Sequence, residues 1–184
     1  MHPTPPPSPL RVVIVTGARD CGKTTALVEA VEELKRLGHR VAGFVQPAER
    51  HDDEKNAYFV RDVATGEEAP LARKLALGRG LAGTRFEFDP AGFALARRAL
   101  ARVASGDVLV VDEMGPLELS GEGHMQPVRV ALATPGLAGA VVCIRDHLLP
   151  PLRQVLGIEI AVVVDTRDHG RDASQAIVAA LCGR

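Results

Sequence analysis

Aromatic residues are scarce in this 184-residue sequence, which has no tryptophan, one tyrosine and five phenylalanines. Proteins that bind single-stranded nucleic acid stack the bases on aromatic side chains, and this chain has few to offer. The formal net charge is −1, whereas nucleic acids and anionic membranes attract surfaces with excess positive charge. We therefore expect neither a nucleic acid nor a membrane among the partners.

Cysteine and long apolar runs are also lacking. Cys21, Cys143 and Cys182 are far apart, and no two of them have the C-x2-C spacing of a zinc site. Three scattered thiols suit a reducing compartment, and no run reaches the roughly 18 apolar residues of a membrane-spanning helix. Residues 1–9 contain five prolines and no apolar segment typical of a signal peptide. These features predict a cytoplasmic protein.

The rest of the composition indicates one folded unit. Apolar residues make up 46% of the chain, enough for a single core. The proline-rich start predicts a disordered extension over residues 1–10, and residues 11–184 contain no repeat or linker that would divide them. Lysine is rare, so the positions of the four lysines, Lys23, Lys35, Lys55 and Lys74, are informative.

Short apolar runs alternate with helical patterns. Strands are expected at residues 12–16, 41–45, 108–111, 139–144 and 158–164. Helices are expected at residues 25–37, 90–105, 125–133, 147–156 and 172–181, the second with Asp89 as its N-cap. This order predicts an α/β fold, a three-layer domain with a mainly parallel central sheet covered on both faces. Residues 58–88 interrupt the alternation and predict a small hairpin insertion.

The strongest motif follows the first expected strand. Residues 17–24, GARDCGKT, fit G-x4-G-K-[ST], the phosphate-binding loop (Walker A motif) of nucleotide-binding proteins. Lys23 is expected to reach the β- and γ-phosphates, and the Thr24 hydroxyl to bind Mg²⁺. The alternative is a glycine-rich turn with an exposed lysine. The candidate nucleotide-binding residues are Gly17, Ala18, Arg19, Asp20, Cys21, Gly22, Lys23, Thr24 and Thr25.

A second acidic motif ends the strand expected at residues 108–111. Asp112 follows this apolar run directly, as a Walker B carboxylate that binds Mg²⁺ does. Because consecutive strand residues point in different directions, Glu113 is expected to face the attacking water and to orient or deprotonate it. The alternative is that Glu113 is a solvated acid at the end of a strand.

Other features point to no single role. Eighteen arginines make the choice of one catalytic arginine from residue type impossible. Cys21 lies at a helix N-terminus, which favours the thiolate, although a small residue there is more often filler. The sequence has no N-K-x-D motif of the kind that reads guanine in Ras-like GTPases.

With both motifs in place, the chain resembles the cancer-related and thermophilic nucleoside-triphosphatase family over nearly all of its length after Leu10. The family pattern G-x-x-G-x-G-K-T-T-L is similar to residues 17–27, with Asp20 where the family favours glycine. The family stretch D-E-[IM]-G-[KP]-[ML]-E-L is similar to residues 112–119, DEMGPLEL.

The resemblance implies a RecA-like P-loop domain and slow, Mg²⁺-dependent hydrolysis of nucleoside triphosphates (ATP or GTP among them) with loose base preference. It implies that Lys23 and Glu113 are catalytic and that Thr24 and Asp112 hold the metal. Gly43-Phe44 followed by Arg50 is similar to the family's G-F…E-x-R segment, which implies a phosphate-side role for Arg50.

Three functions stay open at this point. The first is hydrolysis of a nucleoside triphosphate by water that Glu113 orients. The second is a small-molecule kinase that uses the same loop with another acceptor. The third is a nucleotide-switched adaptor with a protein partner, since residues 43–47, GFVQP, also resemble nucleotide-binding proteins of molybdenum cofactor metabolism.

Overall fold

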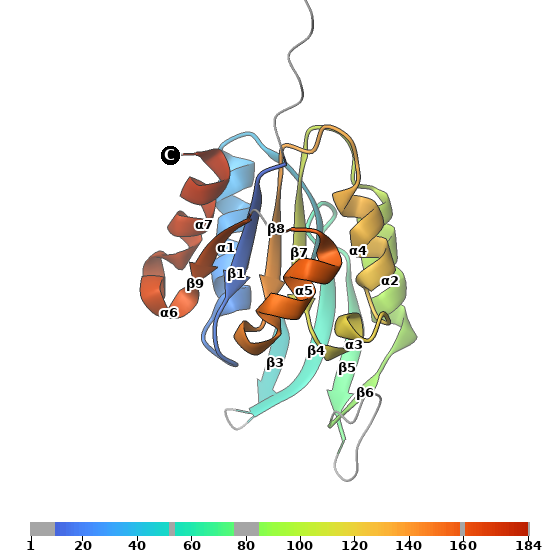
Figure 1. The fold of residues 1–184 in the computed structure, drawn as a ribbon. Helices are drawn as coiled ribbons and strands as arrows, with labels where there is room; N and C mark the ends of the chain where they lie inside the picture. The colour runs from blue at the N-terminus through green and yellow to red at the C-terminus, as the bar shows by residue number, and fades with distance from the viewer. Residues whose placement is uncertain (1–9, 52–53, 76–84, 159–160, 184) are drawn as a thin grey trace, which may run out of the picture.

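Apolar, β-branched runs form the parallel centre of the sheet in the computed structural model, which describes residues 10–51, 54–75, 85–158 and 161–183. The strands lie in the order β2, β7, β8, β1, β9, and each neighbouring pair is parallel (Figure 1). Their bounds are β1 (Val12–Thr16), β2 (Arg40–Val45), β7 (Asp107–Met114), β8 (Gly139–Ile144) and β9 (Ala161–Asp165). The five expected strands are confirmed. Only β9 begins later than expected, and residues 159–160 lie outside the described residues.

An antiparallel group extends this sheet beyond β2. It contains β3 (Ala48–His51), β4 (Glu54–Asp62), β5 (Glu68–Lys74) and β6 (Phe86–Phe88). Strand β4 pairs with β2, β5 with β4, β6 with β5, and β3 with β4. The insertion therefore begins at Ala48, and the expected start at residue 58 is wrong. The polar sequence AERH of β3 lacks the alternation that marks a strand, and residues 76–84 of the expected insertion lie outside the described residues.

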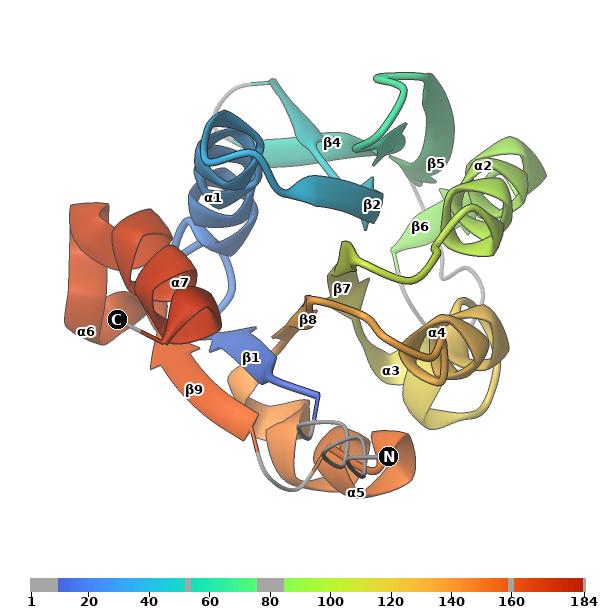
Figure 2. The ribbon, with the colours of Figure 1, turned by 90° about the horizontal axis from the view of Figure 1, so that it is seen from above.

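Helices cover both faces of the parallel strands (Figure 2). On one face lie α1 (Lys23–Arg36) and α7 (Ala173–Cys182), and on the other α2 (Pro90–Ala101), α4 (Met125–Leu132) and α5 (Leu149–Leu156). Short helices and 3₁₀ turns complete the described chain: α3 (Pro116–Leu119), α6 (Thr166–His169), η2 (Asp146–Leu148) and η3 (Gly170–Asp172). The predicted three-layer α/β fold is confirmed.

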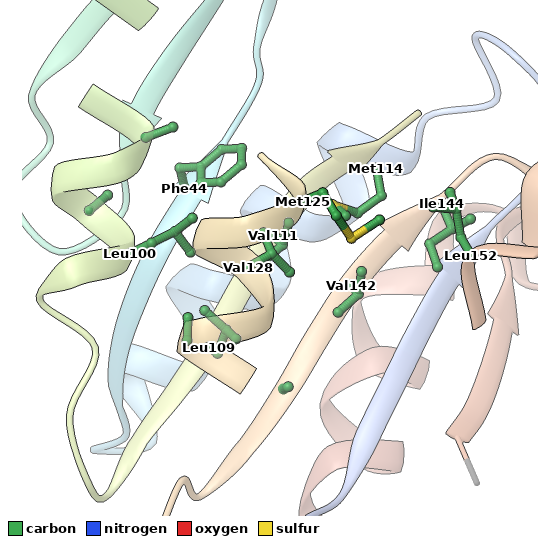
Figure 3. Packing of buried hydrophobic residues seen from close by; sticks show 14 of the residues in the cluster. Phe44, Leu100, Leu109, Val111, Met114, Met125, Val128, Val142, Ile144 and Leu152 are labelled. Carbon is green, nitrogen blue, oxygen red and sulfur yellow. The ribbon is translucent and has the colours of Figure 1, made fainter. Parts of the chain in front are cut away.

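The core consists of two clusters separated by the sheet. Successive β1 residues alternate between them, because side chains of a strand point to opposite faces. Ile14 packs on the side of α2, α4 and α5, and Val13 packs on the side of α1 and α7. Figure 3 shows the first cluster, in which Val111 and Val142 from neighbouring strands are drawn with Val128 of α4.

Helix ends follow the expected chemistry with small shifts. The Asp89 carboxylate accepts a hydrogen bond from the Ala91 N–H, so the predicted N-cap of α2 is confirmed. Helix α1 begins two residues earlier than expected, at Lys23. Leu10, which the sequence assigns to the extension, packs against the core, whereas residues 1–9 lie outside the described residues. None of the helices in the described ranges is long and apolar enough to cross a membrane.

Candidate functional site

The loop from β1 to α1 is shaped by close contacts that exclude larger residues. Gly17 has φ +144°, and a Cβ at this position would lie 2.6 Å from Thr166 Oγ1 and 2.7 Å from Cys21 Sγ. Thr166 follows β9, so the loop packs against the next strand of the sheet. Its hydroxyl donates to the Thr16 carbonyl over 3.2 Å. The glycine that opens the motif is therefore needed for packing as well as for its backbone angle.

The Lys23 side chain is buried and forms hydrogen bonds with this loop. Its side chain lies in the first turn of α1 and only 6% of the residue is exposed. The ammonium group donates to the carbonyl oxygens of Ala18, at 2.7 Å, and Gly17, at 3.2 Å. The alternative of an exposed lysine on a glycine-rich turn is therefore wrong. Thr24 is half-buried and Thr25 exposed in the same turn.

Asp20, where the resembling family favours glycine, has φ +62°. This left-handed conformation is easy for glycine and is also accessible to aspartate. Its carboxylate pairs with Lys55 Nζ at 2.7 Å and with Arg50 Nη2 at 3.4 Å. The hydrogen bond from Lys55 lowers the pKa of Asp20. These ion pairs join the tip of the loop to β3 and β4, and they place Arg50 beside the loop.

Asp112 is fully buried near the carboxyl end of β7. One oxygen, Oδ2, accepts from the Gln46 N–H at 3.1 Å, and Oδ1 has no hydrogen-bond partner among the described residues. Burial, followed by the charge of Glu113, raises the pKa of Asp112 to about 6, although the Gln46 N–H and, to a smaller extent, the nearby Thr24 hydroxyl act to lower it. A buried carboxylate oxygen without a partner costs free energy unless a cation or a donor reaches it.

Glu113 points into a different environment. Its side chain is 20% exposed, and Oε1 accepts from Arg145 Nε at 2.8 Å. Arg145 directly follows β8, the neighbour of β7 in the sheet. Burial opposes the charge on Arg145, but the Glu113 carboxylate prevails and raises the pKa of the arginine. An ion pair with Arg145 thus orients Glu113. The alternative, a solvated acid at the end of a strand, would have no such partner.

Glu113 and Arg145 line a cavity of about 710 Å³ beside the phosphate loop. Aromatic residues and lysines, which are scarce in this chain, are frequent in the wall of this cavity. Four of the six aromatic residues form part of the wall, namely Tyr58, Phe86, Phe88 and Phe93, as do two of the four lysines, Lys55 and Lys74. The antiparallel strands β4 to β6 thus contribute most of the aromatic wall of the cavity.

Glu118 and His124 form part of the cavity wall. The two Glu118 oxygens accept from the Gly115 N–H, at 2.8 Å, and from the His124 N–H, at 3.0 Å. Burial raises the pKa of Glu118. Burial, and after it the charge of Arg97, lowers the pKa of His124 to about 4, so this imidazole is neutral at pH 7. Glu118 therefore fixes the turn that follows Glu113.

The sequence predicts roles for the loop, Asp112 and Glu113, but it does not single out three groups that contact them. Arg145 could have been predicted as a site residue, because it directly follows the apolar strand β8. Asp112 likewise directly follows the apolar residues 108–111. Lys55 was noted only for the rarity of lysine. The backbone N–H of Gln46 could not have been found, since every residue except proline has one.

The residues that face Asp112 could hold a metal ion only together with another ligand. No group of three or more histidine, cysteine, aspartate or glutamate side chains that could hold a metal occurs in the described parts of the chain. Asp112 Oδ1 and the nearby Thr24 hydroxyl are two oxygen donors of the kind that Mg²⁺ binds, and Mg²⁺ commonly takes its other ligands from phosphate and water.

Comparisons with known sequences agree with this geometry. The family model described as NTPase matches residues 12–177. Nucleoside-triphosphatase THEP1 of Saccharolobus solfataricus is 32% identical over 107 residues, which cover 58% of this chain and 61% of the relative, less than two thirds of its length. Nucleoside-triphosphatase THEP1 of Thermofilum pendens is 31% identical over 148 residues, covering 78% of this chain and 79% of the relative.

Solved structures show the same fold. A human cancer-related nucleoside triphosphatase superposes with a TM-score of 0.70 at 25% identity, covering 91% of this chain and 93% of that one. THEP1 from Aquifex aeolicus superposes with a TM-score of 0.67 at 22% identity, covering 90% and 96%. The chain therefore belongs to the NTPase family, a family of P-loop proteins whose curated relatives are named nucleoside-triphosphatases.

Proposed function

We propose that this chain hydrolyses nucleoside triphosphates to the diphosphate and inorganic phosphate, with Mg²⁺. The observation that carries the proposal is the pair of carboxylates at the end of β7. Asp112 is buried with one oxygen unpartnered, whereas Glu113 reaches a cavity beside the phosphate loop. One acid is thus suited to a metal and the other to a water molecule.

The proposed binding of the triphosphate uses the loop itself. Backbone N–H groups of residues 17–22 and the N-terminus of α1 favour phosphate oxygens. Lys23 turns from the Gly17 and Ala18 carbonyls to the β- and γ-phosphates. Thr24 and Asp112 would hold Mg²⁺, which would supply positive charge to neutralise the phosphates. Arg50, which the Asp20 ion pair holds beside the loop, adds positive charge on the phosphate side.

The proposed catalytic group is Glu113. Its carboxylate accepts a hydrogen bond from the attacking water and orients the oxygen toward the γ-phosphorus, or takes the water proton. Arg145 keeps the carboxylate in place through the 2.8 Å contact. If Glu113 were not held in this way, the attacking water would no longer be positioned. Positioning of the nucleophile supplies much of the rate enhancement in phosphoryl transfer.

Four finer properties belong to this proposal. Loose base preference is supported by the sequence, which has no N-K-x-D motif for guanine. Slow turnover and the nucleotides ATP and GTP as substrates are supported by the resemblance to the family. A cytoplasmic location is supported by the three cysteines, which are all free thiols in the structure.

The test is phosphate release from ATP, GTP, CTP and UTP, with Mg²⁺ and with EDTA, for the parent chain and for Glu113→Gln. We expect Glu113→Gln to lose most turnover, roughly 10²-fold or more, while it still binds nucleotide. Glu122→Gln is the matched control, because Glu122 is an exposed acid outside the cavity. Tight nucleotide binding with no turnover by the parent chain would contradict hydrolysis and favour the nucleotide-switched adaptor.

A further inference from the structure

The cavity beside Glu113 is far larger than a single attacking water molecule. It measures about 710 Å³, whereas a water molecule takes up about 30 Å³ of liquid volume. Small-molecule sites in proteins typically have volumes of about 300–1,000 Å³. The cavity is therefore of a size to hold a second ligand in addition to the attacking group.

Its position relative to the nucleotide follows from Glu113. On the proposed function, Glu113 lies at the γ-phosphate, so the cavity opens on the γ-phosphate side of the loop. The described residues that line it include none from β9 or α6, which lie on the other side of β1. A second ligand in this cavity would therefore meet the transferable phosphoryl group.

The wall favours a flat ring. Tyr58 and Phe86 form an edge-to-face pair with ring centroids 5.2 Å apart, and Phe88 and Phe93 are 5.7 Å apart. All four residues are half-buried, and all four line the cavity. A planar aromatic molecule gains stacking energy from a wall of aromatic side chains. A chain with so few aromatic residues places four of them here, rather than in the centre of its core.

One residue of the cavity wall also has a buried polar atom without a partner. His124 is 2% exposed, it lines the cavity, and its Nδ1 has no hydrogen-bond partner among the described residues. Its ring lies between those of Phe44 and Phe93, with centroids 4.7 Å and 5.1 Å away. A buried nitrogen of this kind is stabilised by a ligand that carries a polar ring atom.

We propose that this cavity binds a second substrate, a planar heteroaromatic molecule with a hydroxyl group, and that this hydroxyl accepts the γ-phosphoryl group. The inference rests on the proposed nucleotide site and changes only the acceptor. The hydroxyl oxygen forms a bond to the γ-phosphorus as the bond from that phosphorus to the β–γ bridging oxygen breaks. The diphosphate leaves with that electron pair. Glu113 takes the hydroxyl proton, and the products are a phosphate monoester and the nucleoside diphosphate.

Tyr58 provides a direct test of binding, because it is the only tyrosine and the chain has no tryptophan. The parent chain, with ¹³C-labelled tyrosine, is saturated with ADP and Mg²⁺ so that the nucleotide site is filled. The probes are adenosine, guanosine, cytidine, uridine and pyridoxine, each titrated while the Tyr58 ring signals are followed by NMR. We expect at least one probe to shift these signals saturably. If none does so, the inference is overturned.

Variants decide whether the binding takes place at the aromatic wall. We expect Phe86→Ala, or Phe88→Ala if the first variant does not fold, to weaken binding of that probe roughly tenfold. Phe59→Ala is the matched control, because Phe59 lies next to Tyr58 in β4 but does not line the cavity. Equal weakening by the two kinds of variant would place the probe elsewhere and overturn the inference.

The transfer itself is read by ³¹P NMR of the probe that binds, with ATP, Mg²⁺ and the parent chain. We expect a phosphate monoester of the probe to form. Inorganic phosphate alone would overturn the transfer and leave hydrolysis as the function. Conversely, monoester formation without phosphate release in the absence of a probe would overturn hydrolysis and leave the inference standing.

Discussion

The two sides of the candidate site are built in different ways. On one side, the phosphate loop and Asp112 come from buried parallel strands, and Lys23 and Asp112 are held by backbone groups. On the other side, the aromatic and cationic wall comes from antiparallel strands whose side chains are mostly half-buried or exposed. The first side is of a kind common to phosphate-binding proteins, whereas the second is where one chain can differ from another in its ligand.

The difference between the two sides can be tested by substituting single residues on each side and comparing the effects. If the phosphate-loop side supplies the chemistry and the antiparallel side supplies selectivity, substitutions of the same residue type should have unequal effects.

The largest effect is expected from the two lysines. Lys23→Ala removes the ammonium proposed to meet the β- and γ-phosphates, and should lower kcat/KM for ATP by roughly 10²–10³-fold, as loss of a preorganised donor does. Lys55→Ala removes a lysine of the antiparallel side, which pairs with Asp20 and lies over the Tyr58 ring. It should lower kcat/KM by no more than a few-fold. Steady-state phosphate release measures both, and similar losses would remove the distinction between the sides.

His124 should make stability depend on pH. Its pKa is lowered to about 4 in the folded chain, against about 6.5 when unfolded. Between pH 6.5 and 4 the unfolded chain therefore holds more protons than the folded one. The free energy of unfolding falls as pH falls, by on the order of 3 kcal/mol when the change is complete.

Urea unfolding at pH 7 and at pH 4.5 measures this effect against His124→Phe, which keeps an aromatic ring between Phe44 and Phe93. Asp112 and Glu118 have raised pKa values and contribute with the opposite sign. The difference between the parent and the variant isolates the histidine. A parent that loses no more stability than His124→Phe on acidification would show that His124 titrates normally.

Arg145 should affect turnover more than binding. Arg145→Met removes the 2.8 Å contact to Glu113, and a hydrogen bond between charged groups contributes roughly 1.5–3 kcal/mol. We expect kcat for hydrolysis to fall roughly ten- to a hundredfold, with a smaller change in KM. Arg129→Met on the exposed side of α4 is the control. A change in KM alone would mean that Arg145 binds substrate and does not position Glu113.

The smallest effect is expected at Asp20. Asp20→Asn keeps a residue that tolerates positive φ but removes the charge that pairs with Lys55 and Arg50. Half-exposed ion pairs contribute little, so stability should fall by about 0.5 kcal/mol at low salt. The loss should vanish in 1 M NaCl, where the Debye length is about 3 Å. Glu87→Gln on β6 serves as the control, and a loss that persists in high salt would point to backbone strain.

The parallel side of the fold was predictable because each of its signals is local. The run at residues 12–16 predicts a strand, the glycines after it predict a phosphate loop, and Asp112 directly follows another such run. The antiparallel side was less predictable, since β3 is polar and becomes a strand only by pairing with β4. Its contribution to the site depends on contacts between distant segments, such as Lys55 with Asp20, which no local pattern contains.

The pairing of β1 has a consequence for the order in which the chain can fold. Strand β1 lies between β8 and β9, and Thr166, which closes the loop, is 150 positions from Thr16. During synthesis β1 emerges well before β8 and β9, its two partners in the sheet. Such non-local pairing is slow to form. We therefore expect the phosphate loop to reach its final shape only after β8, β9 and Thr166 have been synthesised.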